Sequence, residues 1–143
     1  MHKYLNRKDK FPQVYLAGGF FSPEQIKTIN AVETMLDKYG HDYFSPRKAG
    51  KTIEHLSEEE KKLHAKEIFE SNCINIMNAN IMLACIDDRD AGTMWEIGYG
   101  YARFKGINIF TFSAHNHGSN IMVSQCVKEH FPSLELVDKF LAS

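Results

Sequence analysis

The sequence predicts a single α/β domain in which a parallel sheet carries helices on both faces. Short apolar runs alternate with segments of helical periodicity along the 143 residues, and this alternation is typical of a parallel sheet. A chain of this length buries enough surface to fold without disulfides or metal ions. Hydrophobic residues make up 43% and charged residues 24%, which favours a globular domain over a disordered chain.

Five short strands are predicted, each bounded by turn-forming or polar residues. Four of them cover residues 14–17, 41–45, 81–86 and 107–112, and a last strand is expected near 134–137. Residues 81–86 are the most apolar run in the chain, so we expect them to form the central strand.

Four helices are predicted between and after these strands, at residues 23–39, 57–77, 93–105 and 120–128. The first two begin with capping boxes, in which a serine and a glutamine or glutamate three residues later satisfy each other's backbone amides. The polar residues 47–56 are expected to form a loop.

The domain organisation and the charge exclude several classes of protein. Residues 1–12 are polar and are expected to form a loose arm before a domain that covers residues 13–143. The net charge is −1 with Lys and Arg spread along the chain, which indicates neither a nucleic acid polymer nor a membrane as partner. No apolar run approaches the roughly 18 residues of a membrane span, and no signal peptide opens the chain.

The cysteines agree with a cytoplasmic protein. Cys73, Cys85 and Cys126 form no C-x-x-C pair and are odd in number, so we expect reduced thiols packed as small apolar groups. His115-x-His117 is the one close histidine pair, and it lacks further ligands at suitable spacing. We therefore expect no metal site and no cofactor.

Ligands of parallel sheets bind at the carboxyl ends of the strands, so the loops at residues 18–21, 87–92 and 113–119 are where chemistry is expected. The loop at 87–92 is strongly acidic. Glu96 follows in what should be the first turn of the next helix, where the positive helix end would favour the ionised form that a nucleophile needs.

Each of these acidic residues also has a structural interpretation. Thr93-x-x-Glu96 is a capping box, Asp90 before Ala-Gly is typical of an Asx turn, and Asp87 with Asp88 could serve only to keep a loop soluble. The spacing alone leaves these alternatives open.

The first loop contains two glycines followed by two aromatic residues. Gly18 and Gly19 would let a ligand approach the backbone, although a tight turn needs the same residues and no dinucleotide-binding fingerprint is present. Phe20 and Phe21 could form a flat wall for a nucleobase or belong to the core.

Four segments taken together resemble one enzyme family, the nucleoside 2-deoxyribosyltransferases. They are VYLAGGFF at 14–21, FSPR at 44–47, DAGTMWEIGY at 90–99 and NIM at 120–122, in the family's order and at similar spacing. The resemblance extends from residue 13 onward and implies a flavodoxin-like parallel sheet of about five strands. It also implies a reaction that needs no cofactor, in which 2-deoxyribose passes between purine and pyrimidine bases with net retention at C1′.

The same resemblance implies a role for individual residues. Glu96 would attack C1′ and carry the sugar, Tyr15 would orient Glu96, and Asp90 would place a carboxylate at the edge of the sugar and base. Asn120 and Met122 match residues that family members lend to a neighbouring subunit, which implies a homo-oligomer with sites at subunit interfaces. The residues expected to contact deoxynucleosides or free nucleobases are Gly18, Gly19, Phe21, Asn72, Gly92, Asn120 and Met122.

Two positions depart from the family pattern. The family usually carries an aspartate where this chain has Asn72, and an amide can bind a base but cannot protonate it. Residues 47–51 stand where the family often has a glutamine that contacts the base. These departures keep two alternatives open: a hydrolase of deoxynucleosides or their 5′-monophosphates, and a nucleoside-binding protein without turnover.

Overall fold

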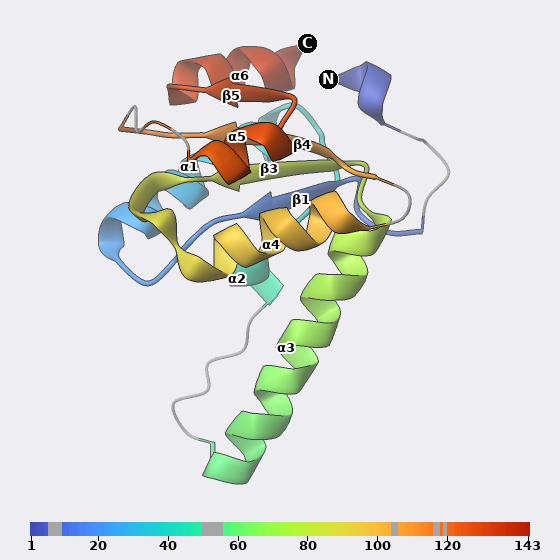
Figure 1. Ribbon diagram of the computed structural model, residues 1–143, viewed down its shortest axis with the longest axis vertical. Coiled ribbons are helices and arrows are strands. Elements are labelled where there is room, and N and C mark those ends of the chain that lie inside the picture. Colours follow the sequence, from blue (N-terminus) through green and yellow to red (C-terminus); the bar gives the residue numbers. More distant parts are fainter. Residues whose placement is uncertain (6–9, 50–55, 104–105, 116–117, 119) are drawn as a thin grey trace.

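The computed structural model describes residues 1–5, 10–49, 56–103, 106–115, 118 and 120–143. Its centre is one parallel sheet with the strand order β2-β1-β3-β4-β5 (Figure 1). The strands are β1 (Val14–Ala17), β2 (Tyr43–Phe44), β3 (Ile81–Cys85), β4 (Asn108–Phe112) and β5 (Glu129–Phe131). This order is that of flavodoxin-like sheets, so the predicted fold class is confirmed.

In the part of the chain that the structure describes, six α-helices pack around the sheet, and two short 3₁₀ helices lie at His2–Tyr4 and Asp87–Arg89. The α-helices are α1 (Pro23–Lys38), α2 (Pro46–Ala49), α3 (Glu58–Asn78), α4 (Ala91–Ala102), α5 (Ile121–Cys126) and α6 (Leu134–Ala142). Both predicted capping boxes are present, because Ser22 pairs with Gln25 and Ser57 pairs with Glu60.

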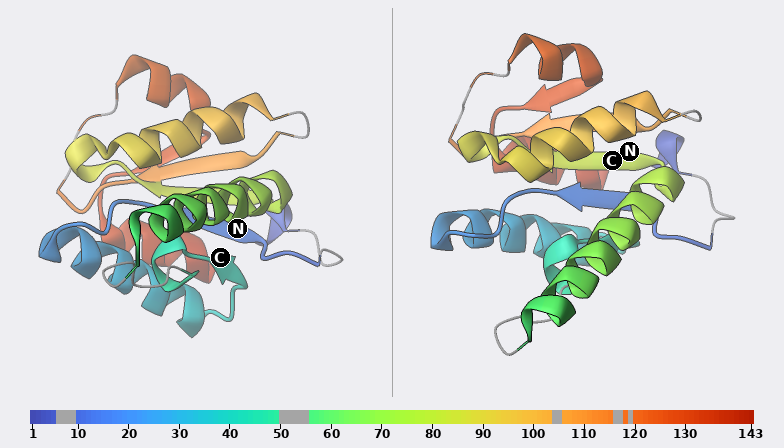
Figure 2. Two further views of the ribbon diagram at one scale, coloured as in Figure 1. Left: turned by 90° about the horizontal axis from the view of Figure 1, so that it is seen from below. Right: turned by 60° about the horizontal axis from the view of Figure 1, so that its bottom comes forward.

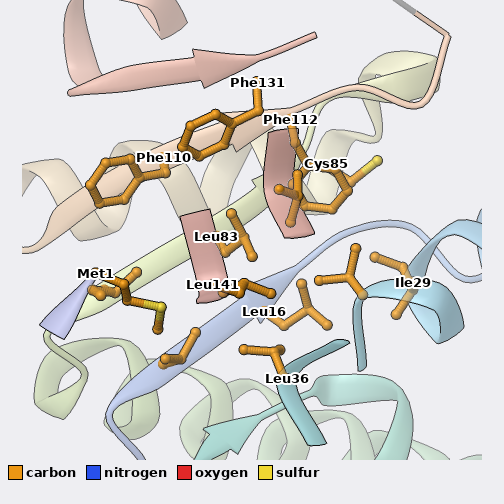
Figure 3. Close-up of a cluster of buried hydrophobic side chains, with 14 residues drawn as sticks. Met1, Leu16, Ile29, Leu36, Leu83, Cys85, Phe110, Phe112, Phe131 and Leu141 are labelled. Atoms are coloured by element: carbon orange, nitrogen blue, oxygen red, sulfur yellow. The ribbon is translucent and has the colours of Figure 1, made fainter. Parts of the chain in front are cut away.

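The two faces of the sheet carry separate hydrophobic clusters, because side chains alternate along each strand. One cluster joins Leu16 and Leu83 to α1 and α6, and Figure 3 shows its aromatic part around Phe110. The other joins Tyr15 and its neighbours to α3 and α4. Every residue of β1 and β3 is buried, as expected for central strands of a sheet covered on both faces.

The C-terminal region differs from the prediction. Residues 134–137 are not a strand but the start of α6, because Ser133 caps the helix through Leu136 N at 3.3 Å. Val137 and Leu141 lie one helical turn apart and are both buried. The last strand is β5 instead, whose exposed Glu129 and polar His130 gave no apolar pattern.

Smaller differences concern the ends of elements. Residues 46–49 of the predicted loop form α2, and residues 50–55 lie outside the described residues. The helix expected at 120–128 covers only Ile121–Cys126. In the segment expected as a loose arm, Met1 is buried in the core and the Tyr4 ring contacts Phe110 edge-on at 5.4 Å.

Helix α3 is the one element that extends well beyond the sheet in both figures (Figures 1 and 2). Several apolar side chains along it are exposed, including Leu63 at 61%, Phe69 at 54% and Met77 at 52%. No helix among the described residues is both long enough and apolar enough to cross a membrane.

Candidate active site

The centre of the site is a carboxylate of α4 facing a tyrosine of β1. The Tyr15 hydroxyl donates a hydrogen bond to Glu96 Oε2. The Tyr15 ring is fully buried and stacks on Phe44 of the neighbouring strand, with ring centroids 5.6 Å apart. Because two paired strands hold this phenol, its hydroxyl has a fixed position relative to Glu96.

Burial sets the protonation of this pair. It raises the pKa of Glu96 to about 7, against a lowering by the Tyr15 hydrogen bond and a further rise from the Asp90 carboxylate. Burial, together with the nearby Glu96, raises the pKa of Tyr15 far above its ordinary value. Tyr15 therefore remains a protonated donor, whereas Glu96 divides between its acid and its anion near neutral pH.

The helix start that was expected at Thr93 is at Asp90. Asp90 Oδ2 accepts from Thr93 N at 2.9 Å and from Thr93 Oγ1 at 2.8 Å, which makes Asp90 the N-cap of α4. Glu96 consequently lies six residues after the cap, in the second turn. The predicted first-turn position of Glu96 and the alternative capping box with Thr93 are therefore both wrong. The pKa of Glu96 is set mainly by burial and not by the positive end of the helix.

Asp87 is not a solubilising loop residue, because only 7% of it is exposed. Its Oδ1 accepts from Ser113 Oγ at 2.5 Å and its Oδ2 from Ala114 N at 2.8 Å. Burial alone would raise the pKa of Asp87, but these donors outweigh it and the pKa is lowered. Asp87 thus joins the carboxyl ends of β3 and β4.

The turn after Asp87 adopts an unusual backbone conformation. Asp88 and Arg89 have φ values of 61° and 49°, in the left-handed region that residues with a Cβ rarely enter. Two such residues cost about 1–2 kcal/mol each, so contacts such as those of Asp87 must hold the turn. The turn directs the chain from β3 into the cap of α4.

Gly18 and Gly19 lie in close contact with side chains of α1. A Cβ on Gly18 would lie 2.3 Å from Ile29 Cδ1, and one on Gly19 would lie 2.6 Å from Gln25 Nε2. Both contacts come from α1, so the glycines bring this helix close to the end of β1. Phe21 is 78% exposed beside them and stacks on Phe20 at 4.8 Å, so it is not a core residue.

Asn72 lies on α3 and lines a cavity of about 180 Å³ between α2 and α3, together with Pro46, Ala49, His64, Glu67, Ile68 and Ser71. Its neighbour Cys73 is close enough to Glu96 for burial and that carboxylate to raise the thiol pKa. The structure thus brings position 72 to the same side of the sheet as Glu96.

Asn120 and Met122 lie elsewhere, at the start of α5. Asn120 caps that helix through Met122 N at 2.8 Å, and Met122 is 74% exposed. Both line a second cavity, of about 350 Å³, with Arg89 and Met94 among its other lining residues. Neither Tyr15 nor Glu96 is among the residues that line that cavity.

Sequence reasoning missed some neighbours of Glu96. Trp95 and Tyr99 of α4 stack at 5.0 Å, and Phe69 of α3 contacts Trp95 at 5.3 Å. Phe44 belongs to the FSPR segment, whose spacing gives no signal for its stacking on Tyr15. The contact between Trp95 and Tyr99 could have been predicted, because residues four apart lie on the same face of a helix. Among the described residues, no group of three or more metal-binding side chains occurs.

Comparisons with known proteins show which family the chain belongs to. A family model described as nucleoside 2-deoxyribosyltransferase matches residues 14–134. The chain belongs to the nucleoside 2-deoxyribosyltransferase family. It is an enzyme of that type.

Solved structures support the family assignment. A 2-deoxyribosyltransferase from the psychrotolerant bacterium Bacillus psychrosaccharolyticus has 30% sequence identity and a TM-score of 0.70, over 87% of this chain and 89% of that one. A conserved protein from Enterococcus faecalis V583 has the same fold at 19% identity, with a TM-score of 0.70 over 92% of this chain and 97% of that one. Among curated proteins, none matched this chain.

Proposed function

We propose that this enzyme transfers 2-deoxyribose between purine and pyrimidine bases through a covalent bond between C1′ and Glu96. The observation that carries the proposal is the partly buried Glu96 carboxylate, oriented by the Tyr15 hydroxyl inside a family-specific motif. A carboxylate held in this way is suited to nucleophilic attack on a sugar carbon.

In the first step an ionised oxygen of Glu96 attacks C1′ of a deoxynucleoside while the bond from C1′ to the base nitrogen breaks. The electron pair of that bond leaves with the base, which accepts a proton. The transition state has oxocarbenium character, so an anion beside C1′ stabilises it before the new bond is complete.

In the second step a ring nitrogen of another base attacks C1′ from the face that the first base left. The bond between C1′ and Glu96 breaks, its electron pair returns to the carboxylate, and the incoming base loses its proton. Two inversions at C1′ give net retention, as in retaining glycosidases.

Tyr15 and Asp90 have supporting roles in this proposal. Tyr15 donates to one oxygen of Glu96 and leaves the other for C1′. Asp90 lies close enough to raise the pKa of Glu96. Because Asn72 has no proton of suitable acidity to give, we propose that the Asp90 carboxylate takes up a proton from solvent before the base leaves, gives it to the departing base, and then accepts the proton that the incoming base loses. Substrate contacts are proposed for Gly18, Gly19, Phe21, Asn72, Gly92, Asn120 and Met122.

We further propose a homo-oligomer in which Asn120 and Met122 complete a neighbouring subunit's site. Helices α3, α4 and α5 expose large apolar side chains that a second copy would cover. They include Leu63 and Phe69 on α3, Trp95 and Tyr101 on α4, and Ile121 and Met122 on α5. A cytoplasmic role in the salvage of deoxynucleosides fits this reaction.

The test is an incubation with thymidine or deoxyinosine plus free adenine, followed by chromatography. Formation of deoxyadenosine is the expected result, together with a protein mass increased by one deoxyribosyl group when acceptor is omitted. Free base and deoxyribose alone would instead indicate a hydrolase. No product with any donor would indicate a binding protein and overturn the proposal.

A further inference from the structure

The loop between β1 and α1, residues 18–22, is fixed by one side chain of the following helix. Gln25 Oε1 accepts hydrogen bonds from two backbone amides of this loop, from Phe21 N at 2.9 Å and from Ser22 N at 3.1 Å. A carbonyl oxygen has two lone pairs, so the loop uses the whole acceptor capacity of this side chain. The backbone of the loop is therefore held in place before any ligand binds.

The bond from Phe21 is more than a helix cap requires. A capping box consists of two reciprocal bonds, and Ser22 and Gln25 already make both of them, the second from Gln25 N to Ser22 Oγ at 3.2 Å. In the capping box of α3, Glu60 accepts from Ser57 N at 3.2 Å, and no other backbone amide of the described residues donates to it. The additional bond at α1 thus serves the loop and not the helix.

Gln25 lies on a rigid support. Ile29, one turn further along α1, is on the same face of the helix and only 2% exposed. The two side chains contact successive glycines, because Ile29 lies against Gly18 and the Gln25 amide lies against Gly19. Without a Cβ at position 19, the amide group can lie directly on the backbone that it holds.

The residue fixed in this way has an unusually exposed ring. Among the large apolar side chains of the described residues, Phe21 is the most exposed, at 78%. Its ring stacks on Phe20, with centroids 4.8 Å apart and ring planes 26° apart. An apolar ring left in water contributes no burial to stability, whereas a ring that is already ordered loses little entropy when a flat ligand packs on it. The arrangement is typical of a contact surface prepared for a ligand.

We propose that Gln25 is a positioning residue, which fixes the loop after β1 so that the exposed ring of Phe21 is in place when a nucleobase binds. The inference rests on the proposed function, in which Phe21 contacts the substrate. Gln25 acts through Phe21 and takes no part in the chemistry at C1′. Its loss should therefore weaken substrate binding and leave the rate of the transfer step little changed.

The experiment compares Gln25→Met and Gln25→Glu with the wild type, in the transfer of deoxyribose from thymidine to adenine. Methionine is as long as glutamine but offers no strong acceptor, whereas glutamate keeps an acceptor oxygen and serves equally well in a capping box. We expect KM for thymidine to rise about five- to tenfold in Gln25→Met, with kcat changed less than about twofold, and to return close to the wild-type value in Gln25→Glu. An unchanged KM in Gln25→Met, or no rescue by glutamate, would overturn the proposal.

Ser22→Ala is the matched control for a purely structural role. It removes the other half of the same capping box and should destabilise the start of α1, as loss of an N-cap does. Both bonds from the loop to Gln25 Oε1 remain, so KM should stay at the wild-type value. If KM rose in Ser22→Ala as much as in Gln25→Met, the start of α1 and not the loop would govern binding, which contradicts the proposal.

Two measurements in the Glu96→Gln background separate this inference from the proposed reaction, because neither needs turnover. In hydrogen exchange followed by NMR, the Phe21 amide should exchange several-fold faster after Gln25→Met and remain protected after Gln25→Glu. In calorimetry, the affinity for thymidine should fall about five- to tenfold on adding Gln25→Met. These two results support the positioning role even if no base exchange is ever observed. Equal exchange rates, or equal affinities with and without Gln25→Met, would contradict it whatever reaction the enzyme catalyses.

Discussion

Two acidic side chains nine residues apart, Asp87 and Glu96, have different roles because their surroundings differ. Asp87 at the end of β3 receives hydrogen bonds from Ser113 and Ala114, and its pKa is lowered even though burial opposes this. Glu96 on α4 receives one from Tyr15, and burial raises its pKa to about 7. The well-satisfied Asp87 carboxylate holds the strand ends together, whereas the less satisfied Glu96 is the carboxylate that we propose as the nucleophile.

The largest expected effect is the loss of turnover in Glu96→Ala. Without the carboxylate no deoxyribosyl bond can form, so we expect the transfer rate to fall by roughly 10³-fold or more. The measurement is initial-rate chromatography of deoxyadenosine formation, with circular dichroism to establish that the variant is folded. An Ala variant that retains activity would show that another group carries the sugar.

The second expected effect, about 3 kcal/mol, is the destabilisation caused by Asp87→Ala, because the substitution leaves Ser113 Oγ and Ala114 N without their acceptor. Urea unfolding monitored by fluorescence would measure it. Asp42→Ala is the matched control, since Asp42 is exposed and is not among the residues with a positive φ. If both variants unfolded at the same urea concentration as the wild type, the hydrogen bonds of Asp87 would not stabilise the fold.

Unlike Asp87→Ala, Glu96→Gln should increase the free energy of unfolding, by an amount that depends on pH. The folded-state pKa of about 7 lies above the ordinary 4.5, so the wild type binds its proton more tightly when folded and loses stability as the pH rises through 7. This difference corresponds to on the order of 3 kcal/mol at most, and partial exposure reduces it. We expect Glu96→Gln to melt higher than the wild type at pH 8 and to lose that advantage near pH 4.5, in thermal scans.

The fold and the motif that contains Glu96 could be predicted from the sequence. The hydrogen-bond donors that make Asp87 and Glu96 different could not. The motif around Glu96 and the alternation of strands and helices identified the fold and the family-like segments. Whether Asp87 or Glu96 was satisfied depends on donors from distant segments, Ser113 and Tyr15, which only the folded sheet brings near. The cap at Asp90 rather than Thr93 was likewise decided by local geometry that spacing leaves open.

The same reasoning explains the other differences. β5 was missed because a three-residue edge strand with an exposed glutamate has no apolar signature. The Glu33–Arg47 pair joins α1 to α2 across residues far apart in sequence, and no motif announces it. The capping boxes at Ser22 and Ser57 and the core periodicity depend on neighbouring residues, so they were predictable, whereas the cap at Asp90 and the tertiary partners were not.

Tyr15→Phe would test how the hydrogen bond from the Tyr15 hydroxyl to Glu96 affects the pKa of that carboxylate. Because the Tyr15 hydroxyl lowers the pKa of Glu96 against the effect of burial, its removal should raise that pKa above about 7. In the wild type kcat/KM should increase as the pH rises through about 7, and in Tyr15→Phe the same increase should occur at higher pH. Coincident pH profiles for the two proteins would mean that Tyr15 does not set the ionisation of the nucleophile.

The smallest expected effect is a gain of a few-fold in rate from Asn72→Asp. Asn72 lines the cavity beside α2, and an amide there can bind a base but cannot protonate it. A carboxyl group at this position would share with Asp90 the protonation of the leaving base. Fully effective general acid catalysis raises a rate by more than a few-fold, so a gain of this size is modest. Asn75→Asp, one turn further along α3, introduces the same charge outside the residues that line the cavity and should not raise the rate. If Asn72→Asp transferred no faster than the wild type under single-turnover conditions, then departure of the base would not be limited by its protonation, and the amide at position 72 would be a binding group alone.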